Sequence, residues 1–448
     1  MRALYDSKSY TIDDKGIKKQ LSKTAKYQAW LDVEIALAKA QGEFGVIPNS
    51  AAKNIGKVKL EDIDFEEMDR IYKKIGHGFV PFLKVLTKAC DEESGKYVHY
   101  GVTTQNIQQT SQLFIIKEIN KSIYLLLGDT LKSLSKLALE HKETVIAGRT
   151  HGQHALPITY GYKASVWISE LLTSIERMKE AEKRIFTVMM GGAIGAFNSS
   201  GEVGRLVQDR VAEILDMESM DIPSRNMSLH KIEYIMNLSL IASTAHKVAE
   251  EIYYTSGSEY SEVSEAFQKG TIGSSTMPQK INPKLSKGII ANSQKLYSLI
   301  ATGLYSCPRL FEGDSSSYML LDGLLEEAIE LIREILPRFE ELVRTLTIKP
   351  KNMAKNIKLT NGLINSEHIM MKMASRLGKD KAHKLIYELS IKSTNENIEY
   401  SKLLMENEVI SLAFTQKEIL EILDPKNYIG LCSKMAEEFS EKAINHLK

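Results

Sequence analysis

The chain has 448 residues, which is long for a single hydrophobic core, so we expect two or three domains. Charged residues make up 26% of it but balance to a formal net charge of +1, which argues against a protein that binds nucleic acid or a membrane surface. Cys90, Cys307 and Cys432 lie far apart without CxxC spacing, so they indicate neither a disulfide framework nor a zinc site.

The sequence shows no signal for secretion or for membrane insertion. Its first residues, Met1 to Lys8, contain no apolar run of the kind that a secretory signal peptide needs. No stretch approaches the roughly 20 apolar residues that span a bilayer as a helix. Widely spaced cysteines also suit a reducing compartment. We therefore expect a soluble, cytoplasmic protein that binds neither membranes nor nucleic acid.

Helical periodicity dominates the chain. Apolar residues recur at the i, i+3, i+4, i+7 spacing of a helix with one buried face, for example at Leu321, Leu324, Leu325 and Ala328. Pro337 interrupts this pattern and should kink the segment rather than end it. Five such segments, each much longer than an average helix, are expected at residues 110–142, 157–188, 227–256, 284–302 and 320–346.

Patterns of alternating apolar and polar residues, which would predict strands, are nearly absent. The chain is therefore predicted to be all-α, with three helical domains. Residues 1–96 are expected to form a small N-terminal domain, residues 97–347 a central bundle of the five long helices, and residues 348–448 a small C-terminal domain. The apolar stripes are too wide for the strict heptads of a coiled coil.

A polar cluster at residues 98–106 lies directly ahead of the first long helix. Its consecutive hydroxyls, Thr103 and Thr104, and the amide of Asn106 could join the helix N–H groups in binding an anion. The simpler interpretation is that a threonine or the asparagine only caps the helix. On these residues alone, both interpretations stay open.

A second polar cluster, residues 148–157, contains His151 and His154. Two histidines three residues apart could bind a metal from one face of a helix. However, Gly152 separates them and no acidic ligand is near, so we expect no metal. A lone His151 is more often a hydrogen-bonded loop residue than a catalyst. Its imidazole nevertheless has the right pKa for a proton donor near neutrality.

The most informative stretch is the polar loop at residues 270–283. It places two adjacent hydroxyls, Ser274 and Ser275, ahead of the ammonium of Lys280 and the amide of Asn282. A carboxylate or a developing carbanion could receive hydrogen bonds from all of them. Serine, glycine and proline are also ordinary loop residues, so composition alone does not separate a site from a linker.

This loop resembles the Gly-Ser-Ser-x-Met-Pro-x-Lys-x-Asn-Pro loop of the aspartase/fumarase superfamily, and residues 273–283 match all of its specified positions. Enzymes of that superfamily remove a proton β to a leaving group and release an unsaturated acid, usually fumarate. The resemblance implies that Ser274 is the general base, with Ser275 beside it as a substrate contact. It also implies that Lys280 and Asn282 hold the substrate carboxylate.

The cluster at residues 148–157 is similar to the Gly-Arg-Thr-His-Gly-x-His-Ala-x-Pro segment of adenylosuccinate lyases, which belong to the same superfamily. In those enzymes the histidine after the threonine protonates the leaving group. The resemblance therefore implies that His151 is the general acid and that Thr150 contacts a carboxylate of the substrate.

The cluster at residues 98–106 is similar to the His-Tyr-Gly-x-Thr-Ser-x-Asp segment that binds the dicarboxylate in the superfamily. Thr103, Thr104 and Asn106 stand at the matching positions, with asparagine where aspartate is usual. His77 matches a histidine of adenylosuccinate lyases, although the acidic residue that follows it there is missing. The resemblance implies that these residues bind substrate.

The resemblance also implies an assembly and a ligand. Superfamily members place the central helices of four subunits in one large bundle and build each active site from three subunits, so we expect a homotetramer with shared active sites. The substrate is expected to be a small molecule that contains a dicarboxylate. Neither a cofactor nor a metal is implied.

Some residues depart from the adenylosuccinate lyase pattern. Gly313 and Asp322 replace two arginines of a segment in those phosphate-binding enzymes, and Lys287 stands where a glutamate usually orients the histidine acid. A nucleotide monophosphate would therefore meet few cations here. Residues 376–383 and 423–430 are instead similar to 3-carboxy-cis,cis-muconate cycloisomerases.

We therefore predict a lyase that cleaves a C–N or C–O bond β to a carboxylate and releases fumarate, from a substrate other than a nucleotide monophosphate. One alternative is a cycloisomerase that acts on a muconate-like tricarboxylate at the same site. A second alternative, from a different class, is a catalytically silent helical oligomer that keeps the loop as support for the fold.

Overall fold

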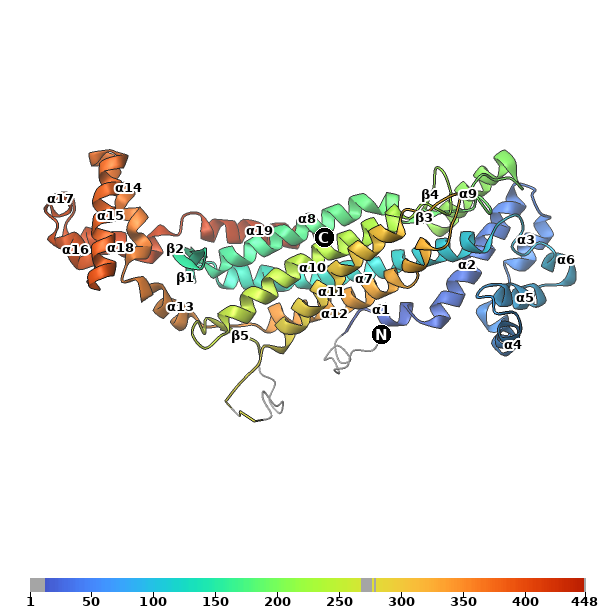
Figure 1. Ribbon diagram of the computed structural model, residues 1–448, viewed down its shortest axis with the longest axis horizontal. Coiled ribbons are helices and arrows are strands. Elements are labelled where there is room, and N and C mark those ends of the chain that lie inside the picture. The colour runs from blue at the N-terminus through green and yellow to red at the C-terminus, as the bar shows by residue number, and fades with distance from the viewer. Residues whose placement is uncertain (1–12, 267–275, 278, 447–448) are drawn as a thin grey trace. The chain divides into compact units, whose positions relative to one another are not determined.

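The computed structural model describes residues 13–266, 276–277 and 279–446 (Figure 1). Within these ranges the chain forms nineteen α-helices and three pairs of short strands, which confirms the predicted all-α class. No described helix combines the length and the hydropathy that crossing a membrane requires. In the same ranges, no three His, Cys, Asp or Glu side chains are grouped so that they could hold a metal ion.

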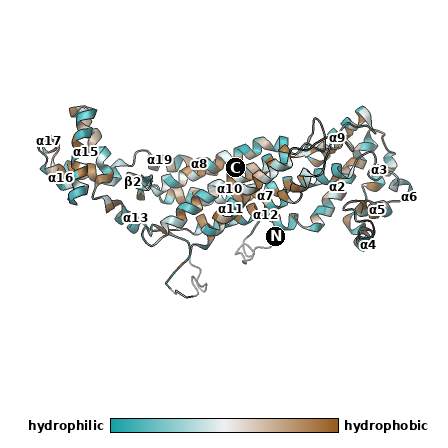
Figure 2. Cartoon of the chain, in the orientation of Figure 1, coloured by the Kyte–Doolittle hydropathy of each residue, from teal (hydrophilic) through white to brown (hydrophobic). Residues whose placement is uncertain are grey.

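The five predicted long helices are present, and their ends differ from the predicted ones by a few residues. They are α7 (Thr104–Glu140), α8 (Tyr160–Ile185), α10 (Leu229–Thr255), α11 (Lys284–Ser306) and α12 (Leu324–Thr345). Pro337 lies inside α12 without ending it. Figure 2 shows hydrophobic and hydrophilic residues side by side along these helices, as expected of helices that bury only one face.

The chain forms two compact units, and each unit contains part of every long helix. Unit 1 comprises Met1–Leu126, Ser174–Ser243 and Ala291–Pro337, and unit 2 comprises Leu127–Thr173, Thr244–Ile290 and Arg338–Lys448. Both units therefore combine segments that are far apart in the sequence. The division into domains at residues 1–96, 97–347 and 348–448 stays a prediction.

An aromatic core organises the short helices of unit 1. Trp30 contacts Phe79 and Phe82 edge-on, with ring centroids 4.8 and 5.4 Å apart. Burial of each ring stabilises the fold by about 1.5–3 kcal/mol. Val98 and Val102 pack against the same core, which therefore supports the segment leading into α7. The helices of unit 1 other than the five long ones are α1 (Ile17–Gln20), α2 (Lys23–Glu43), α3 (Asn49–Ile55), α4 (Phe65–Ile75), α5 (Val80–Ala89), α6 (Glu92–Gly95) and α9 (Gly201–Leu215).

Unit 2 has a second apolar core, in which Ile369, Met373, Ile386 and Tyr400 are buried together. A capping box at Thr415 starts one of its helices, since the hydroxyl accepts a hydrogen bond from the backbone three residues later. The short helices of this unit are α13 (Pro350–Asn356), α14 (Ser366–Leu377), α15 (Lys379–Glu396), α16 (Tyr400–Glu406), α17 (Glu408–Ser411), α18 (Gln416–Leu423) and α19 (Cys432–His446).

The strands are short and form three separate pairs. β1 (Val145–Thr150) pairs antiparallel with β2 (Gln153–Thr159), β3 (Thr187–Val188) pairs parallel with β4 (Glu218–Ser219), and β5 (Val263–Ser264) pairs antiparallel with β6 (Thr347–Ile348). The first pair corrects the helix predicted to begin at residue 157, because Pro157 belongs to β2 and the helix begins at Tyr160. Proline cannot donate the hydrogen bond of a helix interior, whereas an edge strand tolerates it.

Candidate active site

His151 lies at the tip of the β1–β2 hairpin. Thr150 pairs with Gln153, so His151 and Gly152 form a two-residue turn, and both have a left-handed backbone, with φ of 52° and 75°. This turn suits the twist of a hairpin but favours glycine and asparagine, so a histidine there costs of order 1 kcal/mol. The His151 side chain is exposed. The hairpin therefore presents an imidazole outward at the expense of local strain.

An ion pair anchors the hairpin inside unit 2. The Arg149 guanidinium donates two hydrogen bonds to the Glu262 carboxylate, at 2.5 and 3.1 Å, and Glu262 is only 2% exposed. Asn356 on α13 also donates to Glu262, at 2.9 Å. A bidentate pair of this kind constrains direction as well as distance. Arg149 and Glu262 therefore hold the end of β1, directly before Thr150 and His151.

His154 has a different environment from His151. It lies on β2 opposite Arg149, and its Nδ1 atom is buried without a hydrogen-bond partner among the described residues. Burial, and then the nearby Arg149, lowers the pKa of His154, which favours the neutral ring. The two histidines thus occupy a hairpin rather than one face of a helix, which corrects the geometry considered for a metal pair.

The predicted general base, Ser274, and its neighbour Ser275 lie outside the described residues. Lys280 and Asn282, the predicted carboxylate contacts, come directly before α11; Lys280 is exposed and Asn282 is partly buried. Lys287, at the position where a glutamate was expected, is exposed in the first turn of α11.

Glu265 connects the two ends of the segment that contains the predicted base Ser274, residues 266–283, which we call the serine loop. Its carboxylate accepts hydrogen bonds from the backbone N–H groups of Leu285 and Ser286, at 2.9 and 2.8 Å, and from the Ser286 hydroxyl at 2.7 Å. The first N–H groups of a helix have no partner within the helix, and a carboxylate there also interacts favourably with the helix dipole. Glu265 thus caps α11 from the far side of residues 266–283. No local sequence pattern predicts this contact, because twenty positions separate Glu265 from Leu285.

The threonine segment at the start of α7 is organised around Asn106. The Asn106 side-chain oxygen accepts hydrogen bonds from the backbone N–H groups of Thr103, at 3.0 Å, and Gly192, at 3.1 Å. Asn106 itself is fully buried, whereas Thr103 and Thr104 are partly exposed. Asn106 therefore fixes the backbone of the segment from a buried position, and the partly exposed threonine hydroxyls are better placed to contact a ligand.

Two buried polar residues of α2 support the same segment, and sequence analysis missed both. The Glu34 carboxylate lies 2.7 Å from Nδ1 of His99, and Gln41 donates to the backbone oxygen of Tyr100 at 2.7 Å. Glu34 and Gln41 are 2% and 5% exposed. The only signal in the sequence was a carboxylate and an amide on an otherwise apolar helix face, since buried polar groups normally have partners.

His77 caps α5. Its Nδ1 atom accepts hydrogen bonds from the backbone N–H groups of Phe79 and Val80, each at 3.2 Å. An accepting Nδ1 carries no proton, so the proton of the neutral ring is on Nε2. The side chain is exposed. His77 can therefore offer one N–H donor to a ligand while it stabilises the start of a helix.

The predicted site residues form two groups, one in each unit. Thr103, Thr104, Asn106 and His77 belong to unit 1, and Thr150, His151, Lys280 and Asn282 belong to unit 2. The first group offers hydroxyl, amide and imidazole donors. The second group offers an ammonium and an exposed imidazole.

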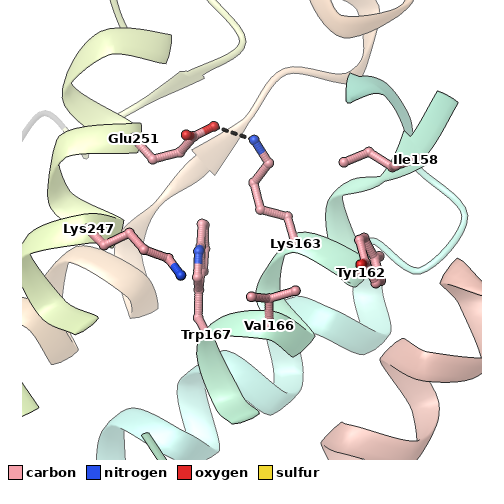
Figure 3. A pocket seen from close by; sticks show the side chains of 7 residues that line it. All are labelled: Ile158, Tyr162, Lys163, Val166, Trp167, Lys247 and Glu251. Carbon is pink, nitrogen blue, oxygen red and sulfur yellow. Dashed lines mark hydrogen bonds and ion pairs between the residues drawn. The ribbon is translucent and has the colours of Figure 1, made fainter. Parts of the chain in front are cut away.

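A separate pocket in unit 2 lies between α8 and α10 and contains none of the predicted site residues (Figure 3). Lys163 and Glu251 form an ion pair within it, which occupies the ammonium that could otherwise bind an anion. The remaining lining residues are Ile158, Tyr162, Val166, Trp167 and Lys247. We assign no role in substrate binding to this pocket.

Comparison with known proteins relates the chain to lyases. Residues 9–295 match the family described as Lyase, and residues 362–439 match the adenylosuccinate lyase C-terminus. The adenylosuccinate lyase of Methanocaldococcus jannaschii is 36% identical over 422 residues, which cover 92% of this chain and 90% of that enzyme. The N-acetyl-S-(2-succino)cysteine lyase of Enterococcus italicus is 33% identical over 442 residues, covering 98% and 93%.

Solved structures show the same fold. The fumarate lyase from Mesorhizobium sp. BNC1 superposes with a TM-score of 0.88 at 27% identity, covering 98% of this chain and 100% of that one. The 3-carboxy-cis,cis-muconate lactonizing enzyme from Pseudomonas putida gives a TM-score of 0.86 at 25% identity, with 98% of each chain covered. The all-α architecture is therefore common to the chain, to a fumarate lyase and to a lactonizing enzyme.

Proposed function

Because the chain belongs to the lyase family of the aspartase/fumarase superfamily, in its adenylosuccinate lyase branch, we propose that it cleaves a succinyl-type substrate by β-elimination and releases fumarate. The substrate carries a succinyl group on a heteroatom. The carbon that loses the β-proton and the carbon that loses the heteroatom are then joined by a double bond, which gives fumarate.

Each predicted site residue has a part in this reaction. Ser274 takes the β-proton, and the electron pair of the broken C–H bond forms the new C=C bond as the bond to the heteroatom breaks. Lys280, Asn282 and Thr104 donate hydrogen bonds to the carboxylates, where negative charge develops. His151 gives a proton to the departing heteroatom.

The observation that best supports this proposal is the conformation of His151. A histidine in this turn costs free energy and gains no burial in return, and backbone strain of this kind is concentrated at functional sites. The turn is anchored by Arg149 and Glu262, so the imidazole is held on a rigid support. A proton donor must be positioned against its acceptor before its pKa can matter.

The names of the relatives narrow the class of substrate. Adenylosuccinate and N-acetyl-S-(2-succino)cysteine both name a succinyl group joined to a larger molecule. We therefore extend the predicted C–N or C–O cleavage to C–S. Since Gly313 and Asp322 stand where arginines were expected, adenylosuccinate itself should be a poor substrate for this chain.

One observation favours a second candidate, a cycloisomerase that forms a lactone from a muconate-like tricarboxylate. Lys287 replaces the glutamate expected beside a histidine acid, and an ammonium cannot accept a hydrogen bond from the imidazole. A solved lactonizing enzyme also shares the fold. Product analysis separates the candidates, because fumarate leaves the substrate whereas a lactone keeps all of its atoms.

The test is a panel of substrates with the purified enzyme and its Ser274→Ala variant. The panel contains succinyl adducts of amines and thiols, adenylosuccinate, and a muconate tricarboxylate, with fumarate and lactone both measured. We expect fumarate from at least one adduct, and a rate about 10²–10⁴-fold lower in Ser274→Ala. Release of no fumarate from any adduct, or an unchanged rate in Ser274→Ala, would refute the proposal.

A further inference from the structure

Three cations gather in unit 1 around Tyr318, which belongs to the 3-10 helix η3 (Ser317–Leu320). The Arg309 guanidinium lies 4.4 Å from the centroid of the Tyr318 ring, and the Lys231 ammonium lies 5.8 Å from it. Arg309 also donates a hydrogen bond to the backbone oxygen of Arg225. We call Arg225, Lys231 and Arg309 the cationic cluster.

Two members of the cationic cluster, Lys231 and Arg309, are buried, and neither forms a direct ion pair with another described residue. Lys231 is 0% and Arg309 is 9% exposed. In the described part of the chain, Lys231 donates only to the neutral amides of Gln109 and Gln112, at 3.2 and 3.5 Å. Arg309 donates only to backbone oxygens, including that of Asp314 at 2.9 Å. Burial of a charge without a directly hydrogen-bonded counter-charge is costly, which indicates that an anion completes the site.

Unused hydrogen-bond donors lie in the same place. Within the described residues, Nη2 of Arg309, Nε2 of Gln109 and the hydroxyl of Ser228 are buried and have no partner. Gln109 and Ser228 are 5% and 2% exposed. Buried donors are nearly always satisfied in folded proteins, so three unsatisfied ones beside two buried cations mark a place for an acceptor. An oxyanion accepts several hydrogen bonds at once.

Arg225 links the cationic cluster to the predicted dicarboxylate contact. Its Nε atom donates to the side-chain oxygen of Gln105 at 2.5 Å, and Gln105 directly follows Thr104 on α7. Arg225 also lies against Gly313, where a Cβ atom would come within 3.3 Å of its Nε. The missing side chain at position 313 therefore makes room for a cation supplied by position 225.

The charges around the cationic cluster favour a singly charged anion over a doubly charged one. Two carboxylates act on its cations electrostatically: Glu326 on Lys231, and Asp314 on Arg309. Their own hydrogen bonds come from Gln112 and Ser316 rather than from the cations. Asp322 also acts on Tyr318, so three carboxylates surround the three cations. A carboxylate ligand adds one negative charge to this balance, whereas a doubly charged phosphate would add two.

We propose that Arg225, Lys231 and Arg309, with the donors of Gln109 and Ser228, bind a carboxylate carried by the leaving portion of the substrate. The inference rests on the proposed elimination, because it concerns the part of the substrate that departs. It narrows the substrate class to succinyl adducts of small amines or thiols that themselves carry a carboxylate. Amino acids and their N-acylated forms belong to this class.

Binding of a product fragment tests the site without turnover. The probes are N-acetylcysteine, its uncharged carboxamide and inorganic phosphate, each titrated into the full-length enzyme by calorimetry. Loss of a charge-assisted contact weakens binding by about 10- to 100-fold. We therefore expect N-acetylcysteine to bind at least about tenfold more tightly than its carboxamide, and also more tightly than phosphate.

Variants assign the effect to the cationic cluster. Lys231→Met and Arg309→Met should each remove the preference for N-acetylcysteine over its carboxamide. The matched control is Lys295→Met, since Lys295 belongs to the same unit but forms a surface ion pair with Glu327 at 2.8 Å. Arg225→Lys keeps the charge and should retain part of the preference, which guards against variants that fail only through misfolding.

A substrate series separates this inference from the proposed function. The series pairs the S-succinyl adduct of N-acetylcysteine with that of its carboxamide, and adenylosuccinate with its dephosphorylated nucleoside. We expect kcat/KM to favour the carboxylate member of the first pair about tenfold or more, and the ratio to fall to near one in Lys231→Met. Cleavage of both members at equal rates would refute the carboxylate site but leave the elimination intact. Charge-selective binding without cleavage of any adduct would support the carboxylate site but refute the proposed elimination.

Discussion

His151 has a left-handed backbone at an exposed hairpin tip, and asparagine adopts that conformation at a lower cost. We therefore expect His151→Asn to keep or slightly raise the melting temperature while lowering the rate. The loss should reach about 10²–10⁴-fold for basic leaving groups and be much smaller for weakly basic ones. Steady-state kinetics over a series of leaving groups checks this. Equal losses across the series would exclude a proton-donor role.

Lys231 carries its charge in a buried environment, and burial lowers its pKa to about 8, although Glu326 opposes the shift. Between pH 8 and the ordinary lysine pKa, the unfolded chain binds more protons than the folded one, so stability rises with pH in that window. Below pH 8 the folded protein bears the cost of the buried charge.

Lys231→Met should therefore raise the free energy of unfolding at pH 7, by at most about 3 kcal/mol, and its advantage over the wild type should shrink as the pH rises to 10. Urea unfolding at both pH values in a buffer without binding anions measures this. A stability difference that stays constant between pH 7 and pH 10 would contradict a depressed pKa.

At the scale of elements, the start of α11 depends on a residue from the other end of the serine loop. Glu265 satisfies two backbone N–H groups and the hydroxyl of Ser286. A helix cap is typically worth about 1 kcal/mol, and this one also connects the ends of the segment that contains Ser274. This contact supports the start of the helix, and we expect it to influence the position of the predicted base as well.

We expect Glu265→Ala to lower the free energy of unfolding by about 1–2 kcal/mol and kcat by about tenfold. Glu265→Gln keeps an accepting oxygen and should lie between the variant and the wild type. Glu259→Ala, at an exposed carboxylate of the same stretch, is the control. If Glu265→Ala loses stability but turns over normally, the cap does not position the loop.

For the whole molecule, several large apolar side chains remain exposed on the single chain. Tyr305, Leu310, Phe311 and Met319 are each at least 70% exposed. Large apolar side chains exposed to this extent within one short stretch of the sequence suit a surface that other chains cover. The superfamily resemblance predicts that the cover is supplied by further copies, in a tetramer whose active sites are shared.

Light scattering should therefore give four times the chain mass of 50.4 kDa. A mixture of Ser274→Ala and His151→Asn subunits, refolded together, should recover part of the activity that each lacks alone, because some sites then receive both intact residues. A fully active monomer, or a mixture that stays inactive after exchange of subunits is demonstrated, would rule out shared sites.

Local patterns determined much of this protein. The five long helices follow from apolar spacing within single segments, since each turn of a helix is built from residues three and four apart. The candidate site residues could be predicted because polar clusters with unusual spacing stand out in an amphipathic helical chain, and their resemblance to a superfamily supplied their predicted roles.

The contacts that support the candidate site could be learned only from the tertiary structure, because they depend on which distant segments pack together. The strands of the His151 hairpin show no alternation of buried and exposed residues, the Glu265 cap joins residues twenty positions apart, and Glu34 supports His99 from α2. The cationic cluster likewise draws Arg225, Lys231 and Arg309 from separate segments. None of these pairings has a period, so only the packed chain reveals them.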